Sequence, residues 1–387
     1  MTSRLVTPRF ALLTTAGFLY FLAMGSQFPV LPAYVQDELG GGSVAVGLSV
    51  GAFGLSSAVL RPVVGPLGDR RGRRFLVMFG GIVAGLAMAA NVVADTVGLV
   101  ITFRLLTGLG EAALFVGVAA AIQDGAPANR RGEAASYFST AVYGGLAAGP
   151  LIGEAVFEGM GADAAFLVAG GLSVAGGLLG WWAPGRPAGG STRRPSTYFH
   201  RGAIRPGLVL GVNLIAYAGF LSFIALYAGD VGITRSGTLF ALFAGVVLAM
   251  RVFAARLPDR LGPVRTSTLG LSLSTAGLAC LFVWQTALGA YLGVAVYAVG
   301  QSFMFPALFV VAVESAAPEA RSHAIATFSF FFDAAVGLGG LFLGGVVALS
   351  DRPTAFGVGA LICALDLVLL RRILGPALVP RPVVAVS

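Results

Sequence analysis

Lysine is absent from this chain of 387 residues, and all 25 of its basic residues are arginine. A GxxxxGK[ST] nucleotide-binding loop is therefore excluded, because that loop uses its lysine to contact phosphates. Cysteine and histidine are scarce, with two of each, and they are too scattered to form a metal cluster or a disulfide framework. The HExxH motif is also missing. The sequence therefore predicts no metal and no cofactor, and it offers no catalytic constellation for an enzyme.

Charged residues are also few, at 11% of the chain, whereas 57% of the residues are hydrophobic. Soluble domains carry roughly 25% charged residues, and a chain this apolar could not hide its surface from water. Lipid must therefore act as the solvent. The 56 glycines suit membrane helices, in which small residues let backbones approach closely.

Long apolar runs recur along the whole chain. A helix that crosses the bilayer needs about 20 mainly apolar residues. Twelve such runs can be placed, at 10–32, 44–64, 75–94, 97–121, 134–157, 163–183, 206–228, 237–255, 266–285, 287–313, 323–349 and 354–373. We therefore predict an all-α membrane protein with twelve transmembrane helices. The first run exceeds a signal-peptide core and is interpreted as a retained span.

The arginines are distributed unevenly over the loops that this topology defines. With both termini in the cytoplasm, twenty arginines lie on the cytoplasmic side and two, Arg235 and Arg352, on the other. Three more, Arg61, Arg104 and Arg251, lie within spans. This asymmetry follows the positive-inside rule and predicts a multi-pass protein of the cytoplasmic membrane. Because the net charge of +8 is spread over membrane-edge loops, we expect no nucleic-acid binding.

The two halves of the chain echo each other. RPVVGPLGDRRG at 61–72 matches RVFAARLPDRLG at 251–262 with an offset of 190, and APANRR at 126–131 matches APEARS at 317–322 with an offset of 191. A polar stretch rich in Pro, Gly, Ser and Arg separates the halves at 184–205. We predict two pseudo-symmetric six-helix bundles, 1–183 and 206–387, joined by a cytoplasmic linker at 184–205.

The segment GPLGDRRGRR at 65–74, after the second apolar run, resembles the signature between helices two and three of the major facilitator superfamily. The resemblance implies the major facilitator fold and a conformational gate that steadies the outward-open state. The gate residues that it indicates are Gly65, Asp69, Arg70, Gly72 and Arg73, with Asp124 as a suitable partner for Arg73. An arginine cluster that merely sets the topology is the alternative.

Two further segments resemble the twelve-helix drug/proton antiporters of that superfamily. The fifth run holds Gly145, Gly149, Pro150 and Gly153, similar to the GxxxGPxxGG element of exporters, but Glu154 replaces the last glycine. The first run holds Gly25 followed by PVLPAY at 29–34. The resemblance implies antiport. Glu154 is either a carboxylate near the outer mouth or an exposed residue at the end of a helix, and we favour the second interpretation.

Ionisable residues inside apolar runs are candidates for function, because burying them in a membrane is costly. Arg104 begins RLLTG, which is similar to the RxxxG element of the family, and Glu111 follows two helical turns later, about 10 Å away. We interpret Glu111 as the leading proton-coupling residue, with Arg104 tuning it. A structural contact of Glu111 with an arginine or with the backbone is the alternative.

Asp333 lies within FSFFFDAAVGLGG, in the eleventh run. It is interpreted as a second proton-coupling site or as an anchor for a cationic substrate. The alternative is a structural pair with Arg251. Asp366 and Arg61 lie nearer the ends of their runs, where we expect solvated positions or snorkelling.

Aromatic residues are plentiful, and a mainly aromatic cavity with few polar groups suits an amphiphilic ligand. The residues expected to line such a cavity are Tyr20, Gln27, Tyr137, Tyr143, Asn213, Tyr217, Gln301, Phe305 and Phe332. Packing between helices or contact with lipid is the alternative for each of them.

These observations predict a secondary transporter that exports a small amphiphilic compound in exchange for protons, by alternating access. The expected partners are the small-molecule substrate, protons and the lipid bilayer, and we expect a monomer. One alternative is a major facilitator carrier for a sugar, siderophore or organic acid, including by uptake. Another is a non-transporting membrane sensor, which could lose Arg104, Glu111 and Asp333 and still fold.

Overall fold

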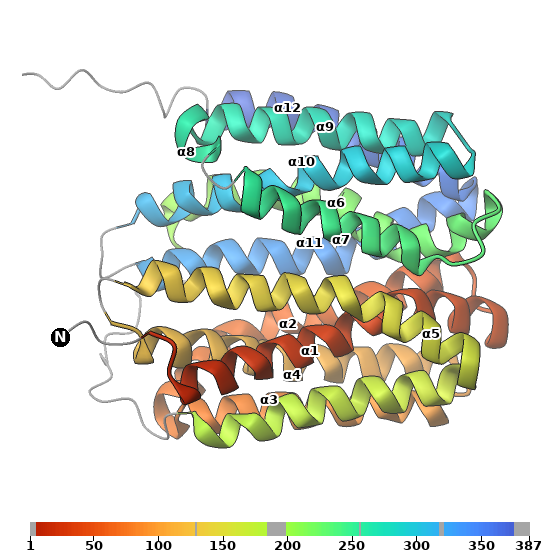
Figure 1. Cartoon of the computed structure of the whole chain (residues 1–387). Coiled ribbons are helices and arrows are strands. Elements are labelled where there is room, and N and C mark those ends of the chain that lie inside the picture. The colour runs from red at the N-terminus through yellow and green to blue at the C-terminus, as the bar shows by residue number, and fades with distance from the viewer. Residues whose placement is uncertain (1–4, 128–129, 184–198, 255–256, 317–320, 375–387) are drawn as a thin grey trace, which may run out of the picture.

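A computed structural model describes residues 5–127, 130–183, 199–254, 257–316 and 321–374. In this part of the chain every regular element is a helix (Figure 1). The longer helices are α1 Pro8–Ala33, α2 Ser43–Arg71, α3 Arg73–Ala89, α4 Val97–Gly125, α5 Arg131–Leu179, α6 Arg201–Asp230, α7 Gly237–Phe253, α9 Pro263–Val283, α10 Ala287–Glu314, α11 Arg321–Leu349 and α12 Arg352–Ile373. Short helical segments are η1 Tyr34–Glu38, η2 Ala90–Val93, η4 Gly180–Trp182 and α8 Leu257–Leu261.

Ten of the described helices are long and apolar enough to cross a membrane, against twelve expected. The difference has two sources. The runs at 134–157 and 163–183 form the single element α5, and the apolar helix α7 is shorter than a full span. The all-helical class is thus observed, and the count of twelve crossings stays a prediction.

Helix α5 is interrupted at Gly161, whose φ of 84° and ψ of 178° are not helical. A straight helix of its 49 residues would be about 73 Å long, more than twice the thickness of a hydrocarbon core of about 30 Å. The chain instead reverses direction there, as Figure 1 shows. Glycine suits this position because a positive φ costs it little.

The segment expected to form the loop after the second run is mostly helical. Helix α2 continues to Arg71, and α3 begins at Arg73. Gly72 between them has a φ of 91°, which again favours glycine. The turn between α2 and α3 is therefore much tighter than a loop spanning 65–74.

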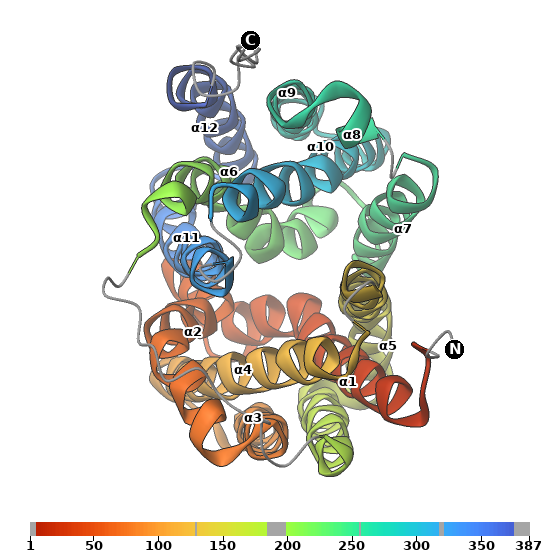
Figure 2. The same ribbon diagram turned by 90° about the vertical axis from the view of Figure 1, so that its left-hand side faces the viewer.

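The helices form two groups (Figure 2). The first group consists of α1–α5 and the second group of α6–α12. Across the gap between the groups, α2 packs against α11 and α5 against α7. The division into two bundles with a linker at 184–205 stays a prediction, because residues 184–198 lie outside the described residues. The last part of that expected linker is helical, since α6 begins at Arg201.

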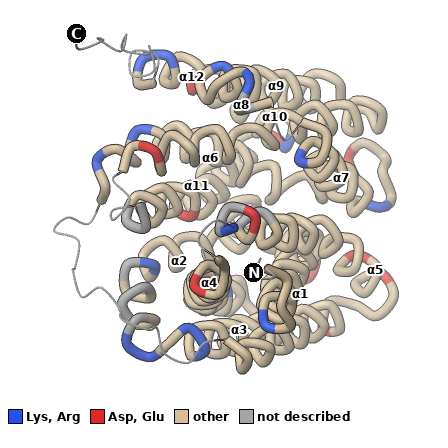
Figure 3. The backbone as a smooth tube through the Cα atoms, turned by 60° about the vertical axis from the view of Figure 1, so that its left-hand side comes forward, with Lys and Arg blue, Asp and Glu red and all other residues tan. Residues whose placement is uncertain are grey.

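Arginines gather at one end of the helices (Figure 3), including the last turns of α2 and α12 and the first turn of α6. We call it the arginine-rich end, and the other the opposite end. Toward the opposite end, glycines of α2 lie against glycines of α11. A Cβ atom on Gly47 would meet the carbonyl oxygen of Gly340, and one on Gly51 would meet that of Gly337. The two groups therefore touch there backbone to backbone.

Candidate proton and substrate site

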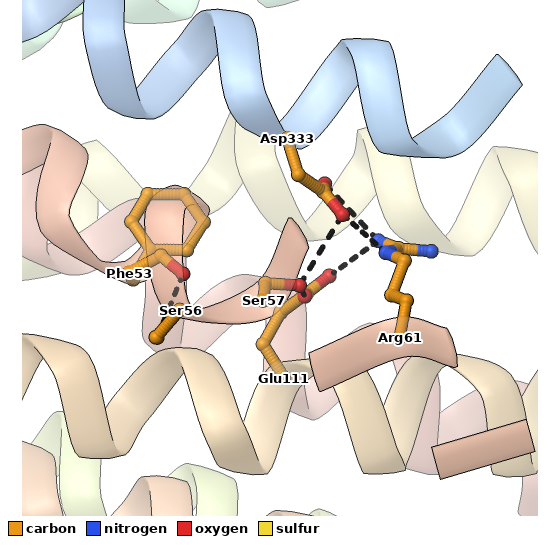
Figure 4. A network of polar contacts seen from close by, with 6 residues as sticks. All are labelled: Phe53, Ser56, Ser57, Arg61, Glu111 and Asp333. Carbon is orange, nitrogen blue, oxygen red and sulfur yellow. Dashed lines mark hydrogen bonds and ion pairs between the residues drawn. The ribbon is translucent and has the colours of Figure 1, made fainter. Parts of the chain in front are cut away.

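A cluster of four polar side chains joins three helices from both groups (Figure 4). Arg61 of α2 donates to Asp333 of α11 through Nε, and its Nη2 lies 3.1 Å from Asp333 Oδ1. The same Nη2 lies 3.3 Å from Oε1 of Glu111 on α4. Ser57, one turn before Arg61, donates to Glu111 Oε2 and lies 3.3 Å from Asp333 Oδ2. One guanidinium is thus shared by two carboxylates.

The three charged side chains of this cluster are buried, with 9% of Arg61, 6% of Glu111 and 4% of Asp333 exposed. The guanidinium carbon of Arg61 also lies 4.8 Å from the ring centre of Phe115. Buried charges are costly unless they are paired. With both carboxylates ionised the cluster carries one net negative charge, so that one added proton makes it neutral. Because Arg61 pairs with these two carboxylates and does not extend to water, the snorkelling interpretation of Arg61 is wrong.

Arg104 of α4 also belongs to the first group, but it lies outside this cluster. Its Nε donates to the carbonyl of Ser49 at 2.9 Å, and its Nη2 donates to that of Val50 at 3.1 Å. Its guanidinium carbon stands 4.8 Å from the ring centre of Phe53. In the described structure Arg61, and not Arg104, contacts Glu111, and the tuning of Glu111 by Arg104 stays a prediction. The reason is geometric, because the Arg104 fork fits two carbonyls of the neighbouring α2.

The alternative in which Asp333 pairs with Arg251 is also corrected. The Arg251 guanidinium on α7 lies over the ring of Tyr143 on α5, 3.9 Å from its centre. Asp333 has Arg61 as its ion-pair partner instead. The sequence carried a signal for this cluster, because Ser57 and Arg61 are four residues apart and share one face of α2.

The expected gate residues lie at the arginine-rich end. Nε of Arg73, at the start of α3, is 3.3 Å from Oδ2 of Asp124, near the end of α4. Arg70 is exposed, and Gly72 makes the turn. Gly65 and Asp69 lie within α2, and the surroundings of these two residues are outside the described part of the structure. The latch function of this segment stays a prediction.

The exporter-like segment of α5 lies against α1. Cβ atoms placed on Gly145, Gly149 and Gly153 would meet the α1 backbone between Phe18 and Ser26. Pro150 is buried in the same stretch, inside the helix. The small residues therefore permit close packing of α1 and α5. The antiport function that the resemblance implies stays a prediction.

Glu154 connects the two groups near the opposite end. Its Oε1 accepts from Ser236 Oγ at 2.6 Å, and its Oε2 accepts from the backbone N–H of Gly237 at 2.8 Å, at the first residue of α7. Interpreting Glu154 as an exposed end residue is therefore wrong. A second link lies nearby in the fold, where Arg352 contacts Asp230 at 2.5 Å and Gln36 at 2.8 Å.

Several of the expected cavity residues lie close to the gap between the groups. Tyr143 and Tyr217 line one small cavity with Phe28 and Phe240. Tyr20 on α1 is fully buried and interacts electrostatically with Glu111 and Arg61. Its hydroxyl oxygen and the Oε1 of buried Gln27 have no hydrogen-bond partner among the described residues. Neither Tyr20 nor Gln27 lines that small cavity.

The remaining expected cavity residues have other surroundings. Asn213 is buried in the second group, and its Nδ2 lies 3.6 Å from Cys363 Sγ on α12. Gln301 donates to the hydroxyl of Tyr297 at 2.9 Å. Phe305 and Phe332 pack edge to face with ring centres 6.1 Å apart. Tyr137 is 46% exposed. Asn213 thus lies between α6 and α12, and its expected place in a substrate cavity stays a prediction.

Asp366 on α12 is a buried carboxylate that sequence reasoning placed in solvent. It is fully buried, and neither carboxylate oxygen has a hydrogen-bond partner in the described part of the chain. It lies seven residues before the end of α12, which in an isolated helix would be near water. Packing of α12 against α6 and α9 removes that water.

The family model described as Major Facilitator Superfamily matches residues 13–340 and 207–385 of this chain. An uncharacterized MFS-type transporter of Salmonella typhimurium is 31% identical over 340 residues, covering 85% of this chain and 87% of the relative. A relative from Burkholderia mallei, also named an uncharacterized MFS-type transporter, is 26% identical over 383 residues and 92% of each chain.

Solved structures share the fold at low identity. A POT peptide transporter in complex with alafosfalin superposes with a TM-score of 0.79 at 14% identity, covering 95% of this chain and 94% of that one. A bacterial homologue of the human lysosomal transporter Spinster, in an inward-facing and unoccupied conformation, gives 0.72 at 17% identity, with 95% and 96% covered. The nucleoside transporter NupG gives 0.73 at 14% identity, with 95% and 99% covered.

Proposed function

The chain belongs to the Major Facilitator Superfamily, and we propose that it exports a small amphiphilic compound in exchange for protons. The observation that carries this proposal is the buried cluster of Arg61, Glu111 and Asp333. Two carboxylates share one guanidinium, and the cluster joins α2 and α4 of the first group to α11 of the second. A proton taken up there changes the attraction between the groups.

The coupling step follows from the charges. When both carboxylates are ionised, Arg61 is attracted to Asp333 across the gap and to Glu111 within its own group. A proton on Asp333 removes its half of this attraction and leaves Arg61 with Glu111. The link between the groups at this point is then weaker. Proton binding thus favours one conformation over the other, and only such differential binding drives a cycle.

Substrate would enter the same cycle beside the cluster. Tyr20 and Gln27 provide buried polar atoms without partners, and Tyr143 and Tyr217 provide aromatic faces. This mixture of aromatic walls and few polar groups suits an amphiphile. A cationic amphiphile would compete directly with the proton for the net negative charge of the cluster.

Export rather than uptake is supported by the resemblance of α5 to the exporter element, which packs α5 tightly on α1. The positive-inside rule favours a cytoplasmic position for the arginine-rich end. Under that orientation the contacts of Gly47, Glu154 and Arg352 close the outer side of the molecule. We expect the protein to act as a monomer in the inner membrane.

The test is transport by purified protein in liposomes with an imposed pH gradient, using a fluorescent cationic amphiphile as the probe. We expect the gradient to drive movement of the probe, and Glu111→Gln to abolish that response. The matched control is Glu158→Gln, because Glu158 is an exposed glutamate of α5. Gradient-driven transport unaffected by Glu111→Gln would remove Glu111 from the coupling step. Probe movement that ignores the gradient in the unmodified protein would refute proton coupling altogether.

A further inference from the structure

The outward face of α3 carries a groove of about 440 Å³ that is separate from the proposed transport site. Its lining residues are two arginines and five apolar residues, namely Arg71, Arg74, Phe75, Met78, Phe79, Ile82 and Val83. The opposite face of α3 packs on the rest of the first group, with Gly80 against α4 and Gly81 against Gly177 of α5. The groove therefore opens away from the protein interior.

The two arginines of the groove carry charge that no described carboxylate neutralises by an ion pair. The Arg71 guanidinium lies over the ring of Phe75, 5.0 Å from its centre, and that of Arg74 lies 4.8 Å from the ring centre of Trp181. Nε of Arg74 is buried without a hydrogen-bond partner among the described residues. Arg73 between them differs, since it pairs with Asp124. Arg71 and Arg74 are thus free to bind an anion.

The position of the groove matches a membrane boundary. Trp181 and Trp182, which end the first group beside α3, are 56% and 47% exposed. Exposed tryptophans of membrane proteins are enriched where headgroups meet the hydrocarbon layer. From Phe75 to Val83 the apolar wall of the groove follows α3 for about 12 Å, away from the arginine-rich end. The arginines of the groove therefore lie at headgroup depth, and its apolar wall runs from them toward the hydrocarbon layer.

We propose that this groove binds one anionic phospholipid from the leaflet at the arginine-rich end. The phosphate lies between Arg71 and Arg74, whose guanidinium groups stack on aromatic rings and have no ion pair with a described carboxylate. An acyl chain runs along Met78, Ile82 and Val83, whose side chains offer no hydrogen-bonding group. A headgroup phosphate joined to a chain satisfies both parts of the groove. Free phosphate would satisfy the arginines alone and leave the apolar wall uncovered.

The binding test compares lipids of equal chain length on purified protein. Native mass spectrometry counts retained phosphatidylglycerol and phosphatidylcholine, and thermal unfolding is measured with each lipid added. We expect retained phosphatidylglycerol and a higher melting temperature with that lipid. The double variant Arg71→Gln/Arg74→Gln should bind phosphatidylglycerol roughly thirtyfold more weakly. Each basic side chain near anionic lipid contributes roughly five- to sixfold to the binding constant, and two are removed.

Two controls distinguish specific lipid binding in the groove from general electrostatic attraction to the protein surface. Arg371→Gln/Arg372→Gln removes the same charge from the exposed last turn of α12, and it should keep full phosphatidylglycerol binding. Ile82→Trp fills the apolar wall without changing charge and should weaken binding. Equal loss in both double variants would mean that only bulk charge attracts the lipid, and the proposal would fall. It would fall equally if inorganic phosphate raised the melting temperature as much as the lipid does.

Discussion

Arg61 on α2 and Asp333 on α11 form an ion pair that joins the two helix groups. Arg61 donates to both carboxylate oxygens of Asp333, which lies 272 residues further along the chain. Two-pronged contacts of this kind fix geometry as well as adding energy. Glu111 competes for the same guanidinium from within the first group. The pair therefore responds to the protonation of either carboxylate.

Asp333→Asn should uncouple transport from the proton gradient. The amide keeps the shape of the side chain but cannot gain or lose a proton, and its attraction to Arg61 is weak. We expect gradient-driven transport in proteoliposomes to fall at least about tenfold, which is the effect of about 1.4 kcal/mol in the cycle. Exchange of the probe at equal pH on both sides should persist. The control is Asp351→Asn, which makes the same change at an exposed helix cap, where the asparagine Oδ1 can still accept from the N–H of Thr354.

Arg61→Met should destabilise the protein in a manner that depends on pH. The variant leaves two buried carboxylates without their cation, and removing one partner of a buried pair costs about 3–5 kcal/mol. Acid relieves this loss, because protonation neutralises the carboxylates. We therefore expect the melting temperature of the variant to approach that of the unmodified protein as pH falls. Arg205→Met, at an exposed arginine of α6, should show no such trend. A deficit that is constant with pH would contradict the shared-guanidinium arrangement.

Arg104→Lys should weaken the fold without altering the pH response. The variant keeps the charge but loses the planar fork that donates to Ser49 and Val50. Leaving one buried carbonyl without a donor costs roughly 1–3 kcal/mol. We expect a lower melting temperature together with an unchanged shape of the pH profile of transport. A shifted profile would return Arg104 to the coupling machinery.

Gly47→Ala should disfavour closure at the opposite end. The added methyl group would meet the backbone of Gly340, and overpacking of this kind costs about 1–3 kcal/mol. That cost falls only on the state in which α2 and α11 touch. We attach one spin label to α2 and one to α11, both at the opposite end of the molecule. The distance between the two labels should shift to longer values. Gly245→Ala is the control, because a Cβ atom there would meet nothing within 4 Å.

Hydropathy predicted the helical class and most helix positions, since about 20 apolar residues in sequence identify a span whatever surrounds it. The resemblance to the major facilitator superfamily, based on short motifs, is confirmed. The sequence also indicated the neighbours Arg73 and Asp124, which lie 3.3 Å apart. Arg73 begins α3 and Asp124 lies near the end of α4, so the predicted topology brings both residues to the same end of the molecule.

The partners of the buried charges were not predictable in the same way. Arg61 lies near the arginine-rich end in sequence, where snorkelling is the ordinary outcome. Its contact with Asp333 depends on how α2 packs against α11, and hence on how the two groups meet. Asp366 and Glu154 were misplaced for the same reason. Depth along one helix does not reveal what a neighbouring helix covers.

The glycine-lined contact of α2 with α11 has a mechanical consequence. Where side chains interlock, two helices must repack many rotamers before they can part. Here Gly47, Gly51, Gly337 and Gly340 present bare backbone to one another, so the helices can hinge or slide apart with few side chains to rearrange. Separation of α2 from α11 at the opposite end therefore requires little repacking of side chains.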